Sequence, residues 1–217
     1  MKIKLAVFDL DGTLVSSHKT IYKAVVKTLK ELKIKAEIPE KEFYNRIGLH
    51  FEDLFKEFGF SVPDFDQFLL VYKSVYFDYA DSSFVYNGVN ETIEMLKQNR
   101  IKISLLTTKA QDQAELNLSF FKLIDQFDYV MGRRPGIANK PSPEPLLKIC
   151  EDLNVSISDT LMIGDSDLDI LCGKNAGTKT CAVTYGYRSK EELIKTSPDF
   201  LIDNLFDLTN ILECSIL

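Results

Sequence analysis

The chain has 217 residues, of which 45% are hydrophobic and 27% charged, and its formal net charge is −6 at pH 7. These values are typical of a globular protein with one large domain or two small ones. The acidic charge argues against a nucleic-acid partner, and no apolar run approaches the roughly 20 residues that span a bilayer, so neither nucleic acid nor a membrane is an expected partner.

Short apolar runs alternate with helical patterns along most of the chain. Buried strands are predicted at residues 3–8, 101–107, 127–131, 160–163 and 179–183. Apolar residues at helical spacing predict helices at residues 89–98, 111–121, 143–153 and 168–174. Strands that alternate with helices form right-handed βαβ units, so we predict an α/β fold with a parallel sheet that helices cover on both faces.

Residues 17–82 differ from this pattern, because their apolar residues recur at helical spacing and no convincing strand interrupts them. The phenylalanines of this stretch are expected to form a small core of its own. The polar stretches 15–17 and 82–83 flank it and are predicted to be unstructured hinges. The expected organisation is therefore a core domain of residues 1–16 and 83–217 with residues 17–82 inserted as a helical domain.

The cysteines show no spacing typical of a metal site. They stand singly, at Cys150, Cys172, Cys181 and Cys214. Buried, reduced thiols of a cytoplasmic protein are the expected state. The apolar run that ends at Phe8 is broken by Asp9 and is too short for a signal peptide, which agrees with a cytoplasmic location.

Polar residues follow several predicted strands at the point where each strand ends. They are Asp9, Asp11, Gly12 and Thr13 after the first strand, Thr107, Thr108 and Lys109 after the second, Lys140 beyond the third, and Asp165, Ser166, Asp167 and Asp169 after the fourth. Ligands of parallel sheets bind beyond the carboxyl ends of the strands, so these side chains are expected to meet. Taken singly, each group could also be an Asp-Gly turn or an acidic helix N-terminus.

Several acids around the single cation Lys140 would be electrostatically costly unless a metal neutralises them, and Mg²⁺ suits such oxygen ligands. With a metal bound, Asp9 can attack phosphorus and form an aspartyl phosphate. Asp11 can then give a proton to the leaving oxygen and take one from water. Thr107 and Lys140 are the expected partners of the phosphoryl oxygens.

Four segments in order, FDLDGTL, LLTTK, KPSPEP and IGDSDLD, make the chain similar to phosphohydrolases of the haloacid dehalogenase (HAD) superfamily over essentially its whole length. The resemblance implies a Rossmann-like core with a helical cap inserted after the first motif, which matches residues 17–82. It implies Asp9 as nucleophile, Asp11 as general acid/base whose carbonyl binds Mg²⁺, Thr107 on phosphate, Lys140 orienting Asp9, Asp165 as metal ligand and Asp169 supporting that ligand set. Gly12, Thr13 and Thr108 complete the expected substrate-binding residues of the core.

Within that superfamily the chain most resembles phosphoglycolate phosphatases, on the segments KPSPEPLLKICEDLNV and IGDSDLDILCGKNAGTKTCAV. Asp11 argues against dehalogenation, which has no leaving alkoxide to protonate. Ile21 and Phe51 stand near the positions where related mutases carry a cap histidine and arginine. The expected activity is Mg²⁺-dependent hydrolysis of a small phosphorylated metabolite. Pyrophosphatase, nucleoside 5′-monophosphatase and sugar-phosphate phosphatase or mutase activity remain alternatives.

A non-catalytic phosphate-binding or signalling module is an alternative of a different class, since receiver domains also gather acids, a threonine and a lysine around Mg²⁺. Asp11 and the long helical insertion argue against it, because a receiver needs neither. Turnover would distinguish the two, since a receiver retains its phosphate. Both a monomer and a homodimer are compatible with the sequence.

Three arginines are further candidates for contact with substrate. Arg133 and Arg134 lie between the third strand and Lys140, where one of them would meet a second acidic group, or both form a solvated basic pair. Arg46 opens a turn ahead of a helix expected to begin at His50 or Phe51. That helix end would suit an anion, or the turn simply joins two helices. His50 itself is expected at the surface.

Overall fold

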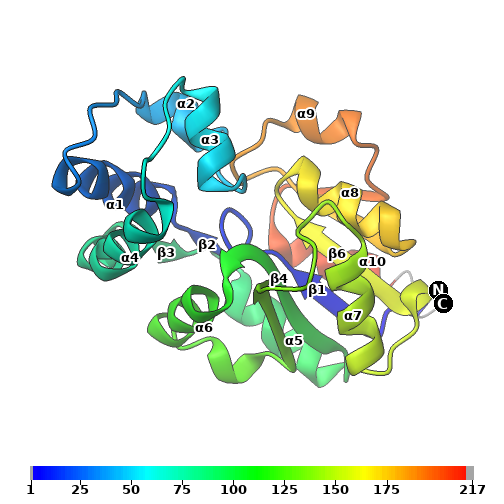
Figure 1. Cartoon of the computed structure of the whole chain (residues 1–217). Coiled ribbons are helices and arrows are strands. Elements are labelled where there is room, and N and C mark those ends of the chain that lie inside the picture. Colours follow the sequence, from blue (N-terminus) through cyan, green and yellow to red (C-terminus); the bar gives the residue numbers. More distant parts are fainter. Residues whose placement is uncertain (1, 214–217) are drawn as a thin grey trace.

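The core of the protein is a six-stranded, wholly parallel sheet with the strand order β5-β4-β1-β6-β7-β8 (Figure 1). This computed structural model describes residues 2–213. The strands are β1 (Leu5–Phe8), β4 (Lys102–Ala110), β5 (Tyr129–Arg133), β6 (Thr160–Gly164), β7 (Lys179–Val183) and β8 (Phe200–Ile202). The predicted α/β fold is confirmed.

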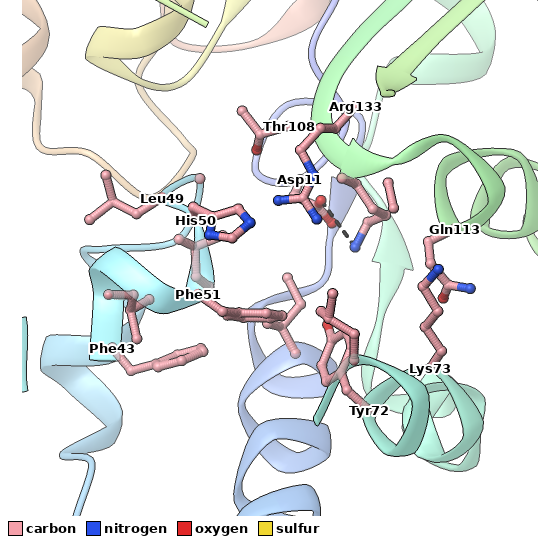
Figure 2. A pocket seen from close by; sticks show the side chains of 17 residues that line it. Asp11, Phe43, Leu49, His50, Phe51, Tyr72, Lys73, Thr108, Gln113 and Arg133 are labelled. Carbon is pink, nitrogen blue, oxygen red and sulfur yellow. Dashed lines mark ion pairs between the residues drawn. The ribbon is translucent and has the colours of Figure 1, made fainter. Parts of the chain in front are cut away.

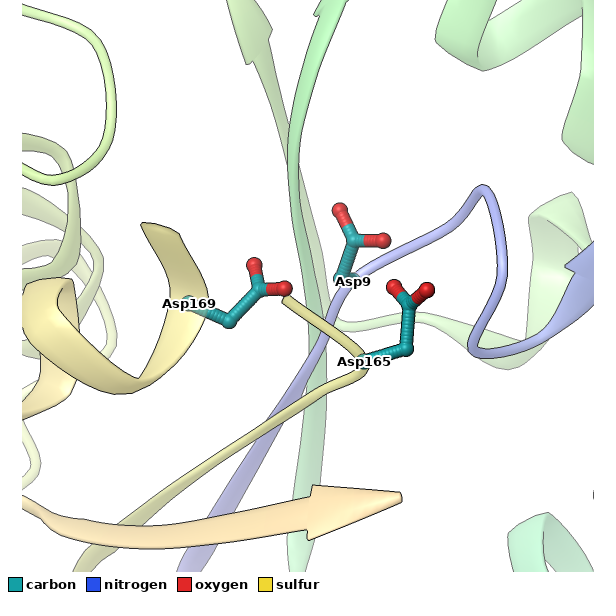
Figure 3. Close-up of side chains that lie close together, drawn as sticks. All are labelled: Asp9, Asp165 and Asp169. Atoms are coloured by element: carbon teal, nitrogen blue, oxygen red, sulfur yellow. The ribbon is translucent and has the colours of Figure 1, made fainter. Parts of the chain in front are cut away.

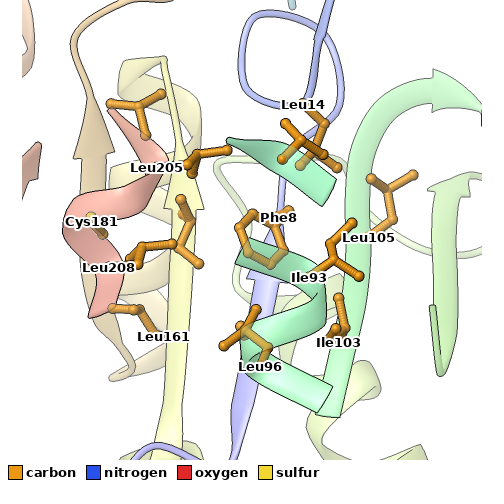
Figure 4. Close-up of a cluster of buried hydrophobic side chains, with 14 of the residues drawn as sticks. Phe8, Leu14, Ile93, Leu96, Ile103, Leu105, Leu161, Cys181, Leu205 and Leu208 are labelled. Carbon is orange, nitrogen blue, oxygen red and sulfur yellow. The ribbon is translucent and has the colours of Figure 1, made fainter. Parts of the chain in front are cut away.

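Helices cover both faces of this sheet. They are α5 (Val89–Gln98), α6 (Gln111–Phe120), α7 (Glu144–Asp152), α8 (Asp167–Ala176), α9 (Lys190–Lys195) and α10 (Leu208–Glu213), with short 3₁₀ turns η2 (Ile124–Gln126), η3 (Ile157–Asp159) and η4 (Leu205–Asp207). In β1, Ala6 and Phe8 belong to the apolar cluster under α5 and α10, whereas Leu5 and Val7 belong to the cluster under α7 and α8 (Figure 4). A strand buried on both faces is apolar throughout, which explains the uninterrupted run in the sequence.

Along the chain, a group of helices separates β1 from the other strands of the sheet. It consists of α1 (His18–Glu31), α2 (Glu40–Tyr44), α3 (Phe51–Glu57), α4 (Phe65–Tyr76) and the 3₁₀ turn η1 (Phe77–Ser82). Its buried side chains, Phe43, Phe55 and Phe68 among them, form a cluster separate from those of the sheet. We call residues 17–82 the cap, and the boundaries of the cap remain a prediction.

The two connections between cap and core differ from the expected unstructured hinges. Strand β2 (Val15–Ser16) pairs antiparallel with β3 (Phe84–Val85), and the N–H of Tyr86 donates to the carbonyl of Leu14 (3.0 Å). The two crossings run side by side, so their backbone groups satisfy one another. The cap is therefore joined to the core through a two-stranded ribbon.

The structure also tests the predictions for the strands, the cysteines and a membrane span. All five predicted strands coincide with sheet strands, whereas β8, α9 and α10 near the C-terminal end were not predicted. Cys150, Cys172 and Cys181 are buried free thiols, and Cys214 lies outside the described residues. Among residues 2–213, no helix combines the length and apolar character needed to cross a membrane.

Candidate active site

Three buried carboxylates meet at the carboxyl edge of the sheet (Figure 3). Asp9 follows β1, Asp165 follows β6, and Asp169 lies in the first turn of α8; one oxygen of each lies within 4.8 Å of the other two. The register brings them together, because Phe8 pairs with Ile163 and the N–H of Asp9 donates to the Ile163 carbonyl (2.9 Å).

Lys140 is the cation that faces this cluster. Its Nζ donates to Asp9 Oδ1 (2.7 Å), Asp169 Oδ1 (2.5 Å) and the Leu106 carbonyl (3.0 Å). Burial opposes the charge of this lysine, but the Asp169 and Asp9 carboxylates outweigh burial and raise its pKa. One lysine against three acids leaves the buried group with an excess of negative charge.

Two of the three carboxyl groups have raised pKa values. Burial raises the pKa of Asp9 well above its ordinary value, with a further contribution from Asp169, although Lys140 opposes the shift. Burial, and then the neighbouring Asp169, raise the pKa of Asp165 to about 7. Such shifts are typical of functional sites and mark carboxylates that a bound cation would stabilise.

The side chain of Asp165 packs directly against two glycines, Gly12 and Gly186, where any larger residue would overlap with it. Its Oδ2 accepts the Tyr187 N–H (2.7 Å), and the Thr13 hydroxyl lies 3.4 Å from its Oδ1. A Cβ at Gly12, whose φ is +96°, would lie 2.3 Å from Asp165 Oδ2, and one at Gly186 would lie 2.2 Å from its Cβ. Gly12 and Thr13, predicted to bind substrate, are thus placed against Asp165.

The donor set fits a hard divalent cation. All three acids offer carboxylate oxygens, and Asp9 Oδ2 accepts no hydrogen bond from residues 2–213. Both oxygens of Asp169 are engaged, Oδ1 by Lys140 and Oδ2 by the N–H (3.0 Å) and hydroxyl (2.6 Å) of Ser166. Within the described part of the chain, Asp9 has an oxygen without a hydrogen bond, and Asp165 Oδ1 has only the 3.4 Å contact with the Thr13 hydroxyl, so these two acids are better placed as ligands. Asp169 supports Lys140 and the loop.

Asp11 does not belong to the cluster of three acids and has partners of its own. Its Oδ2 forms an ion pair with Lys109 Nζ (3.2 Å), and its Oδ1 accepts a hydrogen bond from the Ser17 hydroxyl. The Tyr187 hydroxyl lies 3.2 Å from that same serine oxygen, and Lys109 Nζ lies 4.8 Å from the centre of the Tyr76 ring. Its side chain is thus held by groups from both core and cap.

Two neighbouring spaces lie between cap and core. A chamber of about 20 Å³ is lined by Asp9, Thr107, Lys140 and Asp165. A larger cavity of about 120 Å³ lies beside it, between the core residues Asp11 and Arg133 and the cap residues Phe51 and Tyr72 (Figure 2). Four residues line both spaces, namely Asp11, Ile47, Gly48 and Thr108. The small chamber thus combines carboxylates with a lysine and a threonine, and the larger cavity adjoins it through the shared residues.

The family model of haloacid dehalogenase-like hydrolases matches residues 6–183. The chain belongs to this family. Pyrophosphatase PpaX of Bacillus cereus is 34% identical over 214 residues, which are 98% of each chain. A crystal structure described as a predicted phosphoglycolate phosphatase of Haemophilus somnus 129PT is 26% identical, with a TM-score of 0.83 over 97% of this chain and 98% of that one. A haloacid dehalogenase-like hydrolase of Streptococcus pneumoniae, 22% identical over 96% and 98%, shares the fold with a TM-score of 0.85.

The three candidate arginines of this hydrolase have different surroundings. Arg133 lines the larger cavity. Arg134 donates instead to the Gln111 side chain and to the Val130 carbonyl, both at 3.0 Å. Arg46 forms an ion pair with Glu57 (2.7 Å) within the cap and lines neither space. The expected contacts of Arg134 and Arg46 with substrate therefore find no support in this arrangement.

The turn that Arg46 opens leads into α3, which begins at Phe51 as expected. His50 differs from its expected place at the surface. It is half-buried, lines the larger cavity, and its ring lies 5.2 Å from that of Phe65. Burial, and then the nearby Arg133, lower the pKa of His50, which favours the neutral imidazole.

Two residues for which the sequence predicted no role also shape the hydrolase's site. Lys109, which the sequence placed at this edge of the sheet, pairs with Asp11. Arg188 is buried and joins core to cap, since its Nε lies 3.3 Å from Asp167 Oδ1 and its Nη2 donates to the Ile47 carbonyl (3.2 Å). The position of Arg188 just after β7, on the active edge of the sheet, is the sequence signal that could have identified it.

Proposed function

We propose that the protein is a Mg²⁺-dependent phosphatase that hydrolyses a small phosphorylated metabolite through an aspartyl phosphate on Asp9. The observation that carries this proposal is the state of Asp9 itself. One of its oxygens is held by Lys140, while the other accepts no hydrogen bond within residues 2–213, and the side chain lines the small chamber. A carboxylate fixed in this way is oriented for attack on a phosphorus atom in the chamber.

The reaction takes place in two halves. In the first, an oxygen of Asp9 attacks phosphorus, the bond from phosphorus to the leaving oxygen breaks, and protonated Asp11 gives its proton to that oxygen. In the second, Asp11 takes a proton from water, whose oxygen attacks the phosphorus of the aspartyl phosphate, so that phosphate leaves and Asp9 is restored. The place of Asp11 on the boundary of both spaces suits a group that must reach the leaving oxygen.

Lys140 and Thr107 face the chamber and are the donors for phosphoryl oxygens, where charge develops during transfer. Asp9, Asp165 and the backbone carbonyl of Asp11 would hold Mg²⁺. When bound, the metal supplies positive charge that draws in the phosphoryl group and offsets the charge of the attacking carboxylate. Asp169 keeps Lys140 in place through their 2.5 Å contact.

Two substrate classes have separate support. A phosphomonoester of the phosphoglycolate type agrees with the segments that resemble phosphoglycolate phosphatases and with a cavity beyond the chamber that can hold an organic leaving group. Pyrophosphate is favoured by the 34% identity to a pyrophosphatase over 98% of both chains. We place the phosphomonoester first, because much of the cavity wall consists of apolar side chains of the cap.

Phosphate release tests the proposal directly. The substrates are 2-phosphoglycolate, pyrophosphate, nucleoside monophosphates, sugar phosphates and p-nitrophenyl phosphate, each with Mg²⁺ and with EDTA. We expect multiple turnovers that need Mg²⁺ and that disappear in Asp9→Asn, whereas Asp125→Asn, a change of an exposed carboxylate, retains them. A folded protein that releases phosphate from none of these compounds, or Asp9→Asn with wild-type rates, would refute the mechanism.

A further inference from the structure

The cavity beyond the phosphoryl chamber is lined by the ion-paired residues Asp11, Lys109 and Lys73 and by three further features that a ligand could use. Its volume is about 120 Å³. An apolar cavity of about 150 Å³ is known to take up benzene, so this one holds a leaving group of roughly five to seven non-hydrogen atoms. Within residues 2–213, the three features are a hydrogen-bond acceptor without a donor, a cation without an ion pair, and an apolar surface. Each of them restricts the chemistry of the leaving group.

Gln113 provides the acceptor. It lies in α6, lines the cavity and is only 6% exposed. Its Oε1 is buried and accepts no hydrogen bond from any of the residues 2–213. A buried acceptor without a donor costs free energy, because it has lost its water and gained no partner. Figure 2 shows Gln113 beside Lys73, on the far side of the cavity from His50. Rotation of the amide toward the cavity that Gln113 lines would let a hydroxyl or amino group of a ligand satisfy this oxygen.

Arg133 provides the cation. Its half-buried side chain lines the cavity from the core side (Figure 2) and forms no hydrogen bond or ion pair with the described part of the chain. Its neighbour Arg134, in contrast, donates through Nη2 to the Gln111 side chain and to the Val130 carbonyl. Because the guanidinium remains charged and presents a planar fork of donors, its natural partner is a carboxylate or a second phosphate.

The cap provides the apolar wall. Its members include Ile47, Leu49, Phe51, Leu54, Leu69 and Tyr72. Inorganic pyrophosphate would leave this surface uncovered and would offer Gln113 no carbon-borne donor. The two-carbon leaving group of phosphoglycolate carries a carboxylate but no hydroxyl other than the one that leaves. Both compounds therefore satisfy only part of the cavity.

We infer that the leaving group is a three-carbon hydroxy or amino acid, whose carboxylate binds Arg133, whose hydroxyl or amino group donates to Gln113, and whose carbon chain packs against the cap. This inference rests on the proposed phosphatase activity and names the substrate class of the same site. In the reaction, water hydrolyses the phosphate ester of such an acid to the free alcohol and inorganic phosphate.

Matched substrates test the inference without any variant. 3-Phosphoglycerate carries both groups, 3-phosphooxypropanoate lacks the second hydroxyl, and glycerol 3-phosphate lacks the carboxylate. We expect kcat/KM for 3-phosphoglycerate, or for O-phosphoserine, to exceed that of each incomplete ester and of pyrophosphate by at least about tenfold, as is typical when a hydrogen bond to a charged group is lost or a buried acceptor is left without a donor. Two variants assign the preferences. Arg133→Gln should abolish the preference for the carboxylate, and Gln113→Leu the preference for the hydroxyl or amine, whereas Arg134→Gln keeps both.

The outcomes separate this inference from the proposed function. Equal kcat/KM values across the esters, a preference for pyrophosphate, or preferences that survive in Arg133→Gln and Gln113→Leu would overturn the inference while the phosphatase activity stands. Absence of Mg²⁺-dependent release from every ester, p-nitrophenyl phosphate included, would overturn the proposed function. Thermal unfolding of each variant, compared with the wild type, identifies any loss that arises from misfolding.

Discussion

Asp165 couples the stability of the metal-free protein to pH. Burial is the main cause that raises its pKa to about 7, compared with 3.8 for an ordinary aspartate. Between these two values the folded protein keeps a proton that the unfolded chain has released. Stability falls with rising pH wherever the folded state binds more protons, so the free energy of unfolding should decrease from about pH 4 to about pH 7.

The size of this effect follows from the pKa difference. Roughly three pH units at about 1.36 kcal/mol each correspond to a loss on the order of 4 kcal/mol for this single group. A divalent cation binds the ionised carboxylates and not the protonated ones. Mg²⁺ at about 100 times its dissociation constant should recover about 2.7 kcal/mol at pH 8, and much less at pH 5.

Urea unfolding at pH 5, 6, 7 and 8, in EDTA and in Mg²⁺, measures both effects. Asp165→Asn should remove up to about 1.4 kcal/mol per pH unit from the slope in EDTA, because it removes one titrating group. Asp125→Asn, an exposed change, should leave the slope as it is. The reasoning fails if the wild-type protein shows no fall in stability across this range in EDTA, or if Asp165→Asn shows the same fall.

Two further substitutions test the surroundings of the site. Lys140→Met should abolish phosphate release. It should also lower the free energy of unfolding in EDTA by about 3–5 kcal/mol, since it leaves Asp9 and Asp169 buried without their counter-charge. An unchanged stability in urea would contradict this. Arg188→Met should release the cap loop at Ile47, raising KM by about tenfold with a smaller change in kcat, since the change removes one hydrogen bond between cap and core; steady-state kinetics that show a selective loss of kcat would refute it.

The sheet and the catalytic edge were predictable because their signals are local in the sequence. Strands buried on both faces are apolar runs, as at Leu5–Phe8, and the polar residues that follow each run must lie at one edge of a parallel sheet. Strand β8, with three residues, and the ribbon of β2 and β3, with two residues each, offer no such run. Their strands are defined by pairing across the chain, which no short window contains.

The arginines show where prediction from residue type ends. Arg46, Arg133 and Arg134 carry the same guanidinium, and sequence position placed all three near the site. Arg46 forms an ion pair with Glu57, and Arg134 donates a hydrogen bond to Gln111. Arg133 lines the cavity and has no ion pair among the described residues. Distances to residues far along the chain decided between these outcomes, and the same holds for the pairing of Lys109 with Asp11.

Core and cap contribute different residues to the two spaces, which explains why the reaction is easier to infer than the substrate. Asp9, Thr107, Lys140 and Asp165 all come from the core and line the chamber where phosphorus would lie. The larger cavity, which we propose for the leaving group, is built mostly from cap side chains that also form the cap's own apolar cluster. Any apolar residue of suitable volume can support that cluster, so a change there alters the shape of the cavity at little cost to folding. Asp11 lines both spaces, and its position must suit the leaving group as well as the phosphoryl group.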